Sequence, residues 1–89
     1  MKTVCVVGLG YVGLPTAVIA AQYGYKVIGF DIDAEKVEKI NAGDIDITEP
    51  ELKERLQKVL QVKSFFATTD IPRADFFVIA VPTPLSKQR

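Results

Sequence analysis

The sequence contains no histidine, no tryptophan and only one cysteine, Cys5. Without histidine the chain lacks the side chain used most often as a general base, and it cannot form a Cys/His zinc site. A single cysteine also excludes an intrachain disulfide. We therefore predict no metal site, and a function that depends on glycines, carboxylates, lysines and backbone groups.

The chain also lacks a surplus of charge, because eleven basic residues are balanced by eleven acidic ones. Nucleic-acid binding proteins need a basic surplus for phosphate contacts, and polybasic segments attract anionic membranes. Neither partner is expected here. With 89 residues, 48% of them hydrophobic, the sequence has the size and composition of one small globular domain.

No charged residue occurs between Thr3 and Tyr25, a stretch long enough to span a bilayer and similar in part to a secretory signal peptide. Four glycines, Pro15 and Gln22 interrupt it, so no continuous apolar core remains. We expect this stretch to be buried inside the fold and the protein to be cytoplasmic.

Apolar runs without polar alternation predict strands buried in a parallel sheet, and amphipathic segments predict helices. Asp33 has the position of a helix N-cap, and Thr48 with Glu51 has the spacing of a capping box. Strands are expected at 4–7, 26–31, 64–68 and 75–81, and helices from about 11, from 34 to 41 and from 49. This alternation predicts an α/β fold with right-handed crossovers.

The segment from Gly8 to Gly13 reads G-x-G-x-x-G and lies between a predicted strand and a predicted helix. In that context Gly8 allows a tight turn, Gly10 lets a pyrophosphate approach the backbone, and Gly13 lets the helix pack closely on the strand. The N–H groups of Tyr11 and Val12 would face the phosphates. A turn that binds nothing is the alternative.

Asp31 ends the second predicted strand, 23 residues beyond the first glycine. A carboxylate there accepts hydrogen bonds from the adenine ribose hydroxyls and repels a 2′-phosphate, which predicts NAD rather than NADP. A helix cap is the alternative for Asp31, although Asp33 is better placed for that role. Lys36 could reach the adenosine, or it could be a solvated surface lysine.

These elements predict the first half of a doubly wound NAD-binding domain, a Rossmann-like parallel sheet with strand order 3-2-1-4. Thr83 follows the fourth strand, at the sheet edge where ligands of such folds bind, and could touch the cofactor or simply stiffen the strand exit. Cys5 lies within the first strand, where a thiol is usually an inert small hydrophobe.

Three segments together resemble the UDP-glucose/GDP-mannose dehydrogenase family: 6–15, 31–33 and 80–84. Within the family, segment 45–52 is most similar to the UDP-N-acetyl-D-mannosamine dehydrogenase branch. The resemblance covers essentially the whole chain and implies oxidation of a UDP-sugar C6 alcohol to the uronate, in two steps that each use NAD. It also implies a role in polysaccharide biosynthesis.

By position, the resemblance implies that Tyr11 and Val12 meet the pyrophosphate, Asp31 holds the ribose, Lys36 lies beside it and Thr83 lines the cleft. Cys5 does not match the family's nucleophile, and the catalytic and sugar-binding parts lie beyond Arg89. We therefore expect a partial NAD-binding domain at 1–89 that contains no catalytic residue. The alternative is a stand-alone regulatory module that senses NAD or NADH.

The strand at 75–81 is expected to lie at an edge of the sheet, with unpaired backbone groups and large apolar side chains. Two copies could pair antiparallel along it, which predicts a homo-oligomer. The alternative is that the C-terminal residues fold back over the edge.

Overall fold

The structure, a computed structural model, describes residues 2–10, 12–45 and 50–80. The elements along the chain are β1 (Thr3–Val7), α1 (Gly13–Gln22), β2 (Lys26–Phe30), α2 (Ala34–Asn41), α3 (Pro50–Gln61), β3 (Phe65–Thr68) and β4 (Phe76–Ile79). All strands are parallel and form one sheet in the order β3-β2-β1-β4. The predicted fold class and strand order are confirmed.

The predicted element boundaries differ from the observed ones by one or two residues. Helix α1 begins at Gly13 rather than near Tyr11, because Val12 is its N-cap. The predicted capping-box residue Thr48 lies outside the described residues, and α3 is described from Pro50. Strand β2 ends at Phe30, so Asp31 is the first residue after it.

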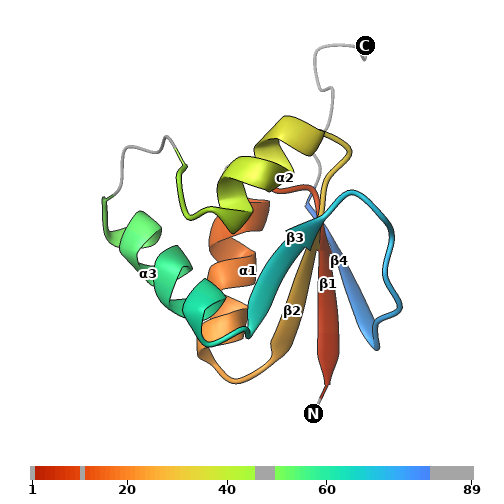
Figure 1. Ribbon diagram of the computed structural model, residues 1–89. Coiled ribbons are helices and arrows are strands. Elements are labelled where there is room, and N and C mark those ends of the chain that lie inside the picture. The colour runs from red at the N-terminus through yellow and green to blue at the C-terminus, as the bar shows by residue number, and fades with distance from the viewer. Residues whose placement is uncertain (1, 11, 46–49, 81–89) are drawn as a thin grey trace, which may run out of the picture.

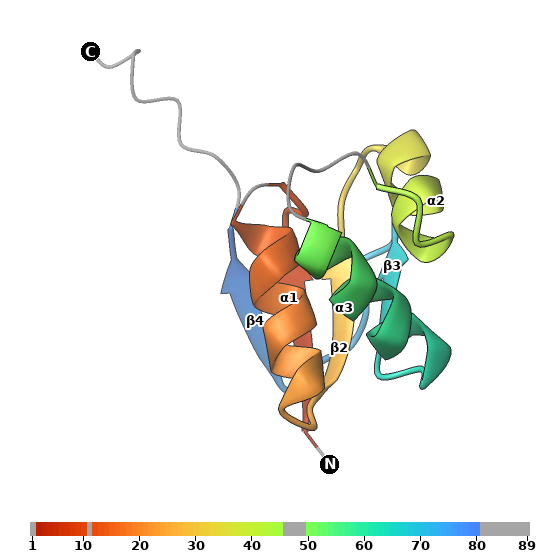
Figure 2. The ribbon, with the colours of Figure 1, turned by 90° about the vertical axis from the view of Figure 1, so that its left-hand side faces the viewer.

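All three helices lie on one side of the sheet, as the two ribbon views show (Figures 1 and 2). Successive right-handed crossovers from β1 to β2 and from β2 to β3 place α1 and α2 on the same face. None of the helices within the described residues is long and apolar enough to cross a membrane.

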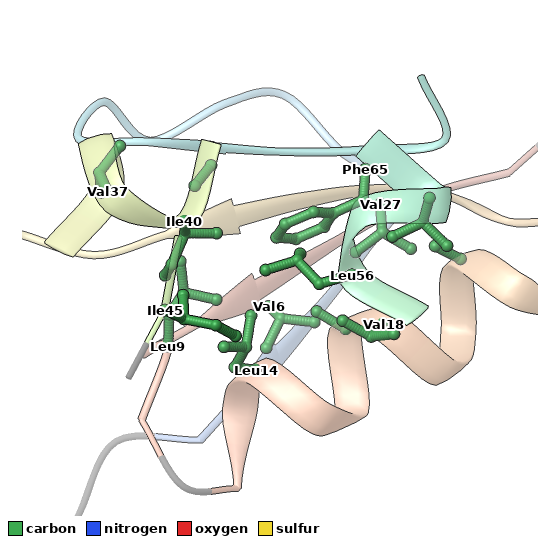
Figure 3. Close-up of a cluster of buried hydrophobic side chains, with 14 of the residues drawn as sticks. Val6, Leu9, Leu14, Val18, Val27, Val37, Ile40, Ile45, Leu56 and Phe65 are labelled. Atoms are coloured by element: carbon green, nitrogen blue, oxygen red, sulfur yellow. The ribbon is translucent and has the colours of Figure 1, made fainter. Parts of the chain in front are cut away.

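The hydrophobic core lies between this helical layer and the sheet, and Figure 3 shows its main side chains. Every second residue of the central strands points into it, and α1, α2 and α3 supply the opposite wall. Fully buried members include Val6, Val18, Val27, Ile40, Leu56 and Phe65.

The other face of the sheet carries no helix in the described part of the chain, and the β3–β4 connection (69–75) runs on that side (Figure 1). One row across it consists of Phe66, Ile28, Cys5 and Phe77 on neighbouring strands. The two central members are buried, whereas Phe66 and Phe77 are 43% and 48% exposed. Strand β4 lies at the sheet edge, as predicted, with all four side chains exposed.

Candidate cofactor site

The glycine-rich loop connects the carboxyl end of β1 to α1, and its glycines differ in their surroundings. Gly8 has φ of +97°, a conformation that suits glycine at a tight turn. A Cβ on Gly13 would overlap the carbonyl oxygen of Gly8, so only glycine allows this close approach of helix and strand. A Cβ on Gly10 would meet no heavy atom within 4 Å. The loop is therefore open at Gly10, where a ligand could approach the backbone.

The N-terminus of α1 faces this opening without an acidic side chain or a side-chain cap. The first helical hydrogen bonds run from Leu14 N–H to Gly10 at 3.1 Å and from Thr16 N–H to Val12 at 3.2 Å. The N–H groups of Val12 and Gly13 donate to no other described residue. Unpaired N–H groups at the positive end of a helix form a binding site for anions such as phosphate.

Asp31 lies at the carboxyl end of β2, next to the glycine-rich loop. Its Oδ2 accepts a hydrogen bond from Leu9 N–H at 3.0 Å, and its Oδ1 accepts one from Asp33 N–H at 3.0 Å. Lys36 Nζ lies 3.4 Å from Oδ2. The side chain is only 11% exposed, so these three donors hold the carboxylate in a fixed orientation.

These donors also determine the charge of Asp31. Burial raises the pKa of the carboxyl group, but the backbone N–H groups of Leu9 and Asp33 and the ammonium of Lys36 lower it. Together they outweigh burial, and the pKa lies below its ordinary value. The group is therefore an anion at neutral pH, suited to accept hydrogen bonds from hydroxyl groups and to repel a phosphate.

Helix α2 is capped by Asp33 and not by Asp31. Asp33 Oδ1 accepts hydrogen bonds from Glu35 N–H at 3.1 Å and Lys36 N–H at 3.2 Å. This cap matches the prediction for Asp33 and leaves Asp31 without a capping role. The side chain of Lys36 contacts Asp31 rather than extending freely into solvent.

The glycine-rich loop and Asp31 lie at one edge of the sheet, because both follow the carboxyl ends of neighbouring strands. Strand β4 pairs with β1 on the side opposite β2. The sheet is therefore extended in one direction by β2 and β3 and in the opposite direction by β4, which makes this a topological switch point. Ligands of open α/β sheets bind at such a switch point. Ala80 lies there, with its N–H bonded to Val7 at 2.8 Å and its Cβ close to Gly13.

Two residues predicted to contact the cofactor, Tyr11 and Thr83, lie outside the described residues. The predicted residues that are described are brought together around the loop and the ends of β1 and β2: Gly8, Gly10, Val12, Gly13, Asp31 and Lys36. Their contact with NAD stays a prediction.

Sequence reasoning missed Leu9, the residue between the first two glycines of the motif. Leu9 is 3% exposed and donates its N–H to Asp31. It also missed Gly29, at which a Cβ would come within 3 Å of Leu9. A glycine inside a strand often marks a close approach of other atoms, and Gly29 was such a signal.

Cys5 has no place in this site. It is fully buried in β1, and burial raises the pKa of its thiol. The neutral thiol that results is a poor nucleophile, which agrees with an inert packing role.

Comparison with known proteins supports a specific assignment. The model of the UDP-glucose/GDP-mannose dehydrogenase family, NAD binding domain, matches residues 2–89. A UDP-N-acetyl-D-mannosamine dehydrogenase of Methanococcus vannielii is 46% identical over 84 residues, which are 94% of this chain and 20% of the relative. The UDP-N-acetyl-mannosamine dehydrogenase of Staphylococcus aureus superimposes with a TM-score of 0.88 at 42% identity, over 93% of this chain and 20% of that chain.

Substrates named for the relatives vary at similar levels of identity. An NDP-N-acetyl-D-galactosaminuronic acid dehydrogenase of Ralstonia nicotianae is 47% identical over 83 residues, 93% of this chain and 20% of the relative. The chain thus spans about a fifth of the length of the curated relatives it matches.

Proposed function

Because the chain belongs to the UDP-glucose/GDP-mannose dehydrogenase family, we propose that residues 1–89 form the first part of an NAD-binding domain in a nucleotide-sugar 6-dehydrogenase. The observation that carries the proposal is the fixed, anionic Asp31 beside an open glycine-rich loop. A carboxylate, and helix N–H groups that donate to no described residue, are the acceptors and donors that a dinucleotide requires at a switch point.

The described residues of the site fit the pyrophosphate and the adenosine ribose of NAD, and the proposal adds Tyr11 and Thr83, which lie outside them. The open backbone at Gly10 and the N–H groups of Val12 and Gly13 would hold the pyrophosphate, together with the N–H of Tyr11. Asp31 would accept hydrogen bonds from the adenosine ribose, with Lys36 beside it. Thr83 would line the cleft. When bound, NAD supplies the acceptor for a hydride removed from the sugar alcohol.

We propose UDP-N-acetyl-D-mannosamine as the sugar, oxidised at C6 in two NAD-dependent steps to a uronate for polysaccharide biosynthesis. The support is the name shared by several of the relatives at 42–52% identity. The chain holds no candidate nucleophile in this proposal, since the Cys5 thiol is buried. The 89 residues alone are therefore proposed to bind NAD without oxidising a sugar.

Calorimetric titration of NAD and NADP into the unchanged chain and Asp31→Asn tests the cofactor assignment. The unchanged chain should prefer NAD, and Asn keeps the shape of the side chain while removing its charge. We expect NAD binding to weaken by about 1–3 kcal/mol, the usual cost of losing a hydrogen bond to a charged group. We also expect the preference over NADP to shrink. Equal affinities of the unchanged chain for NAD and NADP would contradict the proposal.

We further propose that the chain self-associates along the edge strand β4, where all four side chains are exposed. This strand carries no charged residue and no proline between Phe76 and Ile79. Such an edge is a template for pairing with another strand. The cytoplasmic location stays a prediction.

A further inference from the structure

Leu9 is anchored in the hydrophobic core although it belongs to the glycine-rich loop. Its side chain is 3% exposed and is part of the cluster that also contains Leu14, Ile40 and Ile45 (Figure 3). By contrast, Val12 in the same loop is 66% exposed. Among the described residues of the loop, Leu9 is therefore the side chain that ties it to the sheet.

The Leu9 side chain packs directly against the backbone of β2 at Gly29. A Cβ built on Gly29 would lie 2.7 Å from Leu9 Cδ2 and 2.9 Å from Leu9 Cδ1, with Phe65 Cε1 at 3.1 Å. Real side chains do not pack at such distances, so Leu9 occupies the space that any residue other than glycine would need.

The backbone of Leu9 is bonded to the residue that follows this part of β2. Leu9 N–H donates to Asp31 Oδ2 at 3.0 Å, and Asp31 is two residues after Gly29. Gly8 N–H also donates to Phe30 at 2.8 Å. The loop and the end of β2 thus contact each other through the Leu9 side chain and through two backbone donors.

We propose that Gly29 and Leu9 are positioning residues for the cofactor. The contact of the Leu9 side chain with Gly29 fixes the position of the Leu9 N–H, and this N–H orients the Asp31 carboxylate toward the adenosine ribose. This inference rests on the proposed function. A side chain at position 29 pushes Leu9 away from β2, and the N–H leaves the carboxylate. Because the Leu9 side chain is 3% exposed within the core cluster, we expect the displacement to reach the Leu9 backbone rather than to be absorbed by the side chain alone.

The charge state of Asp31 reports this geometry without any ligand. Among the described residues, three groups face its carboxylate. They are the N–H of Leu9 in the loop, the N–H of Asp33 before α2, and the ammonium of Lys36 in α2. Loss of the Leu9 donor removes one of the contributions that lower the pKa. The pKa of Asp31 then moves up, toward its ordinary value.

The first experiment is a titration of Asp31 by carboxyl-carbon NMR in the unchanged chain, Gly29→Ala, Leu9→Ala and the double variant. We expect the pKa to rise in each variant, and Gly29→Ala to add nothing once Leu9 is Ala. Val4→Ala is the control, because it removes core contacts at the far end of β1 and should leave the Asp31 pKa unchanged. An unchanged pKa in Gly29→Ala, or the same rise in Val4→Ala, overturns the proposal.

Should Gly29→Ala fail to fold, the Asp31 pKa measured in Leu9→Ala and in the double variant tests the proposal. An Asp31 pKa in Leu9→Ala equal to that of the unchanged chain overturns the proposal, and a raised pKa that is equal in both variants supports it.

The second experiment separates positioning from cofactor binding. ADP-ribose contains the adenosine ribose, whereas nicotinamide mononucleotide lacks it. We expect Gly29→Ala to weaken ADP-ribose about tenfold, as for loss of a hydrogen bond to a charged group, and to leave the mononucleotide unaffected. Equal weakening of both ligands contradicts positioning through Asp31. Failure of the unchanged chain to bind ADP-ribose overturns the proposed function, while the NMR titration still tests the Leu9–Asp31 link.

Discussion

Gly10 and Gly13 are three residues apart in one loop, yet a methyl group added to each would meet very different surroundings. At Gly13 it would overlap the Gly8 carbonyl, and at Gly10 it would meet open space. We expect Gly13→Ala to lower the free energy of unfolding by about 1–3 kcal/mol or more, the usual cost of overpacking. Urea denaturation of the two variants measures the difference.

Gly10→Ala should leave the stability nearly unchanged and still weaken NAD binding, because the methyl group occupies the approach to the pyrophosphate. The two variants therefore separate a glycine needed for the fold from a glycine needed for the ligand. A Gly10→Ala chain that binds NAD as well as the unchanged chain would show that the phosphates lie elsewhere.

The lowered pKa of Asp31 links its charge to folding. A carboxyl group whose pKa is lower in the folded chain than in the unfolded chain stabilises the fold above the unfolded pKa, and this contribution is lost as the pH falls through the folded pKa. We expect Asp31→Asn to destabilise the fold at neutral pH, and the effect to shrink in acid below the ordinary pKa of aspartate. Denaturation at both pH values measures it, with Val4→Ala as a control whose effect should not depend on pH through this group.

At the same scale, the sequence predicted single residues only where a motif or a cap defines them. Gly8, Gly13 and Asp33 have the conformations or contacts expected from local spacing. The contact of Leu9 with Gly29 was not predictable in this way, because it joins two elements and depends on their packing distance. The same holds for the Leu9 N–H bond to Asp31.

At the scale of elements, the apolar runs predicted all four strands, and their alternation with helices predicted their order. Helix α3 is amphipathic, with Leu56 and Val59 buried against the core. Exposure was harder to predict. Strand β4 has the same uninterrupted apolar pattern as β1. However, β1 lies between β2 and β4 and is buried, whereas β4 lies at the sheet edge and its side chains are exposed. The pattern shows what a strand can bury, and its position in the sheet determines what is buried.

The two edges of the sheet are protected differently. At the β3 edge, Asn41 of α2 donates to Ala67 C=O at 2.9 Å and accepts from Ala67 N–H at 2.8 Å. The amide thus pairs with β3 as a neighbouring strand would. No described residue bonds to the outer side of β4 in this way.

We expect Asn41→Ala to lower the free energy of unfolding by about 1–2 kcal/mol, because two hydrogen bonds between α2 and β3 are lost. Gln57→Ala is the matched control, since that amide makes one bond of 3.2 Å, to Gly43, and should cost less. Thermal or urea denaturation compares them, and equal stabilities of the Asn41→Ala and unchanged chains would show that the Asn41 pair contributes nothing.

At the scale of the whole molecule, the exposed β4 edge and its neighbouring open face predict association. Phe76, Phe77, Val78 and Ile79 are 40–65% exposed, and no side chain among the described residues bonds to their strand as Asn41 bonds to β3. The alternative to a second copy, that the C-terminal residues fold back over this edge, falls on residues 81–89, which lie outside the described residues. We expect two copies of the chain to pair antiparallel about a twofold axis, which gives a dimer with a continuous sheet.

Sedimentation equilibrium at micromolar concentration tests this association. Val78→Lys places a charge on the edge strand and should shift the chain to monomer, because charged side chains on an edge oppose strand pairing. Val62→Lys is the matched control: Val62 is 72% exposed but lies just before β3, at the opposite edge, so the dimer should persist. A monomer in the unchanged chain would refute pairing through β4. A dimer lost equally in both variants would place the interface elsewhere, since a charge at the far edge cannot block bonds along β4.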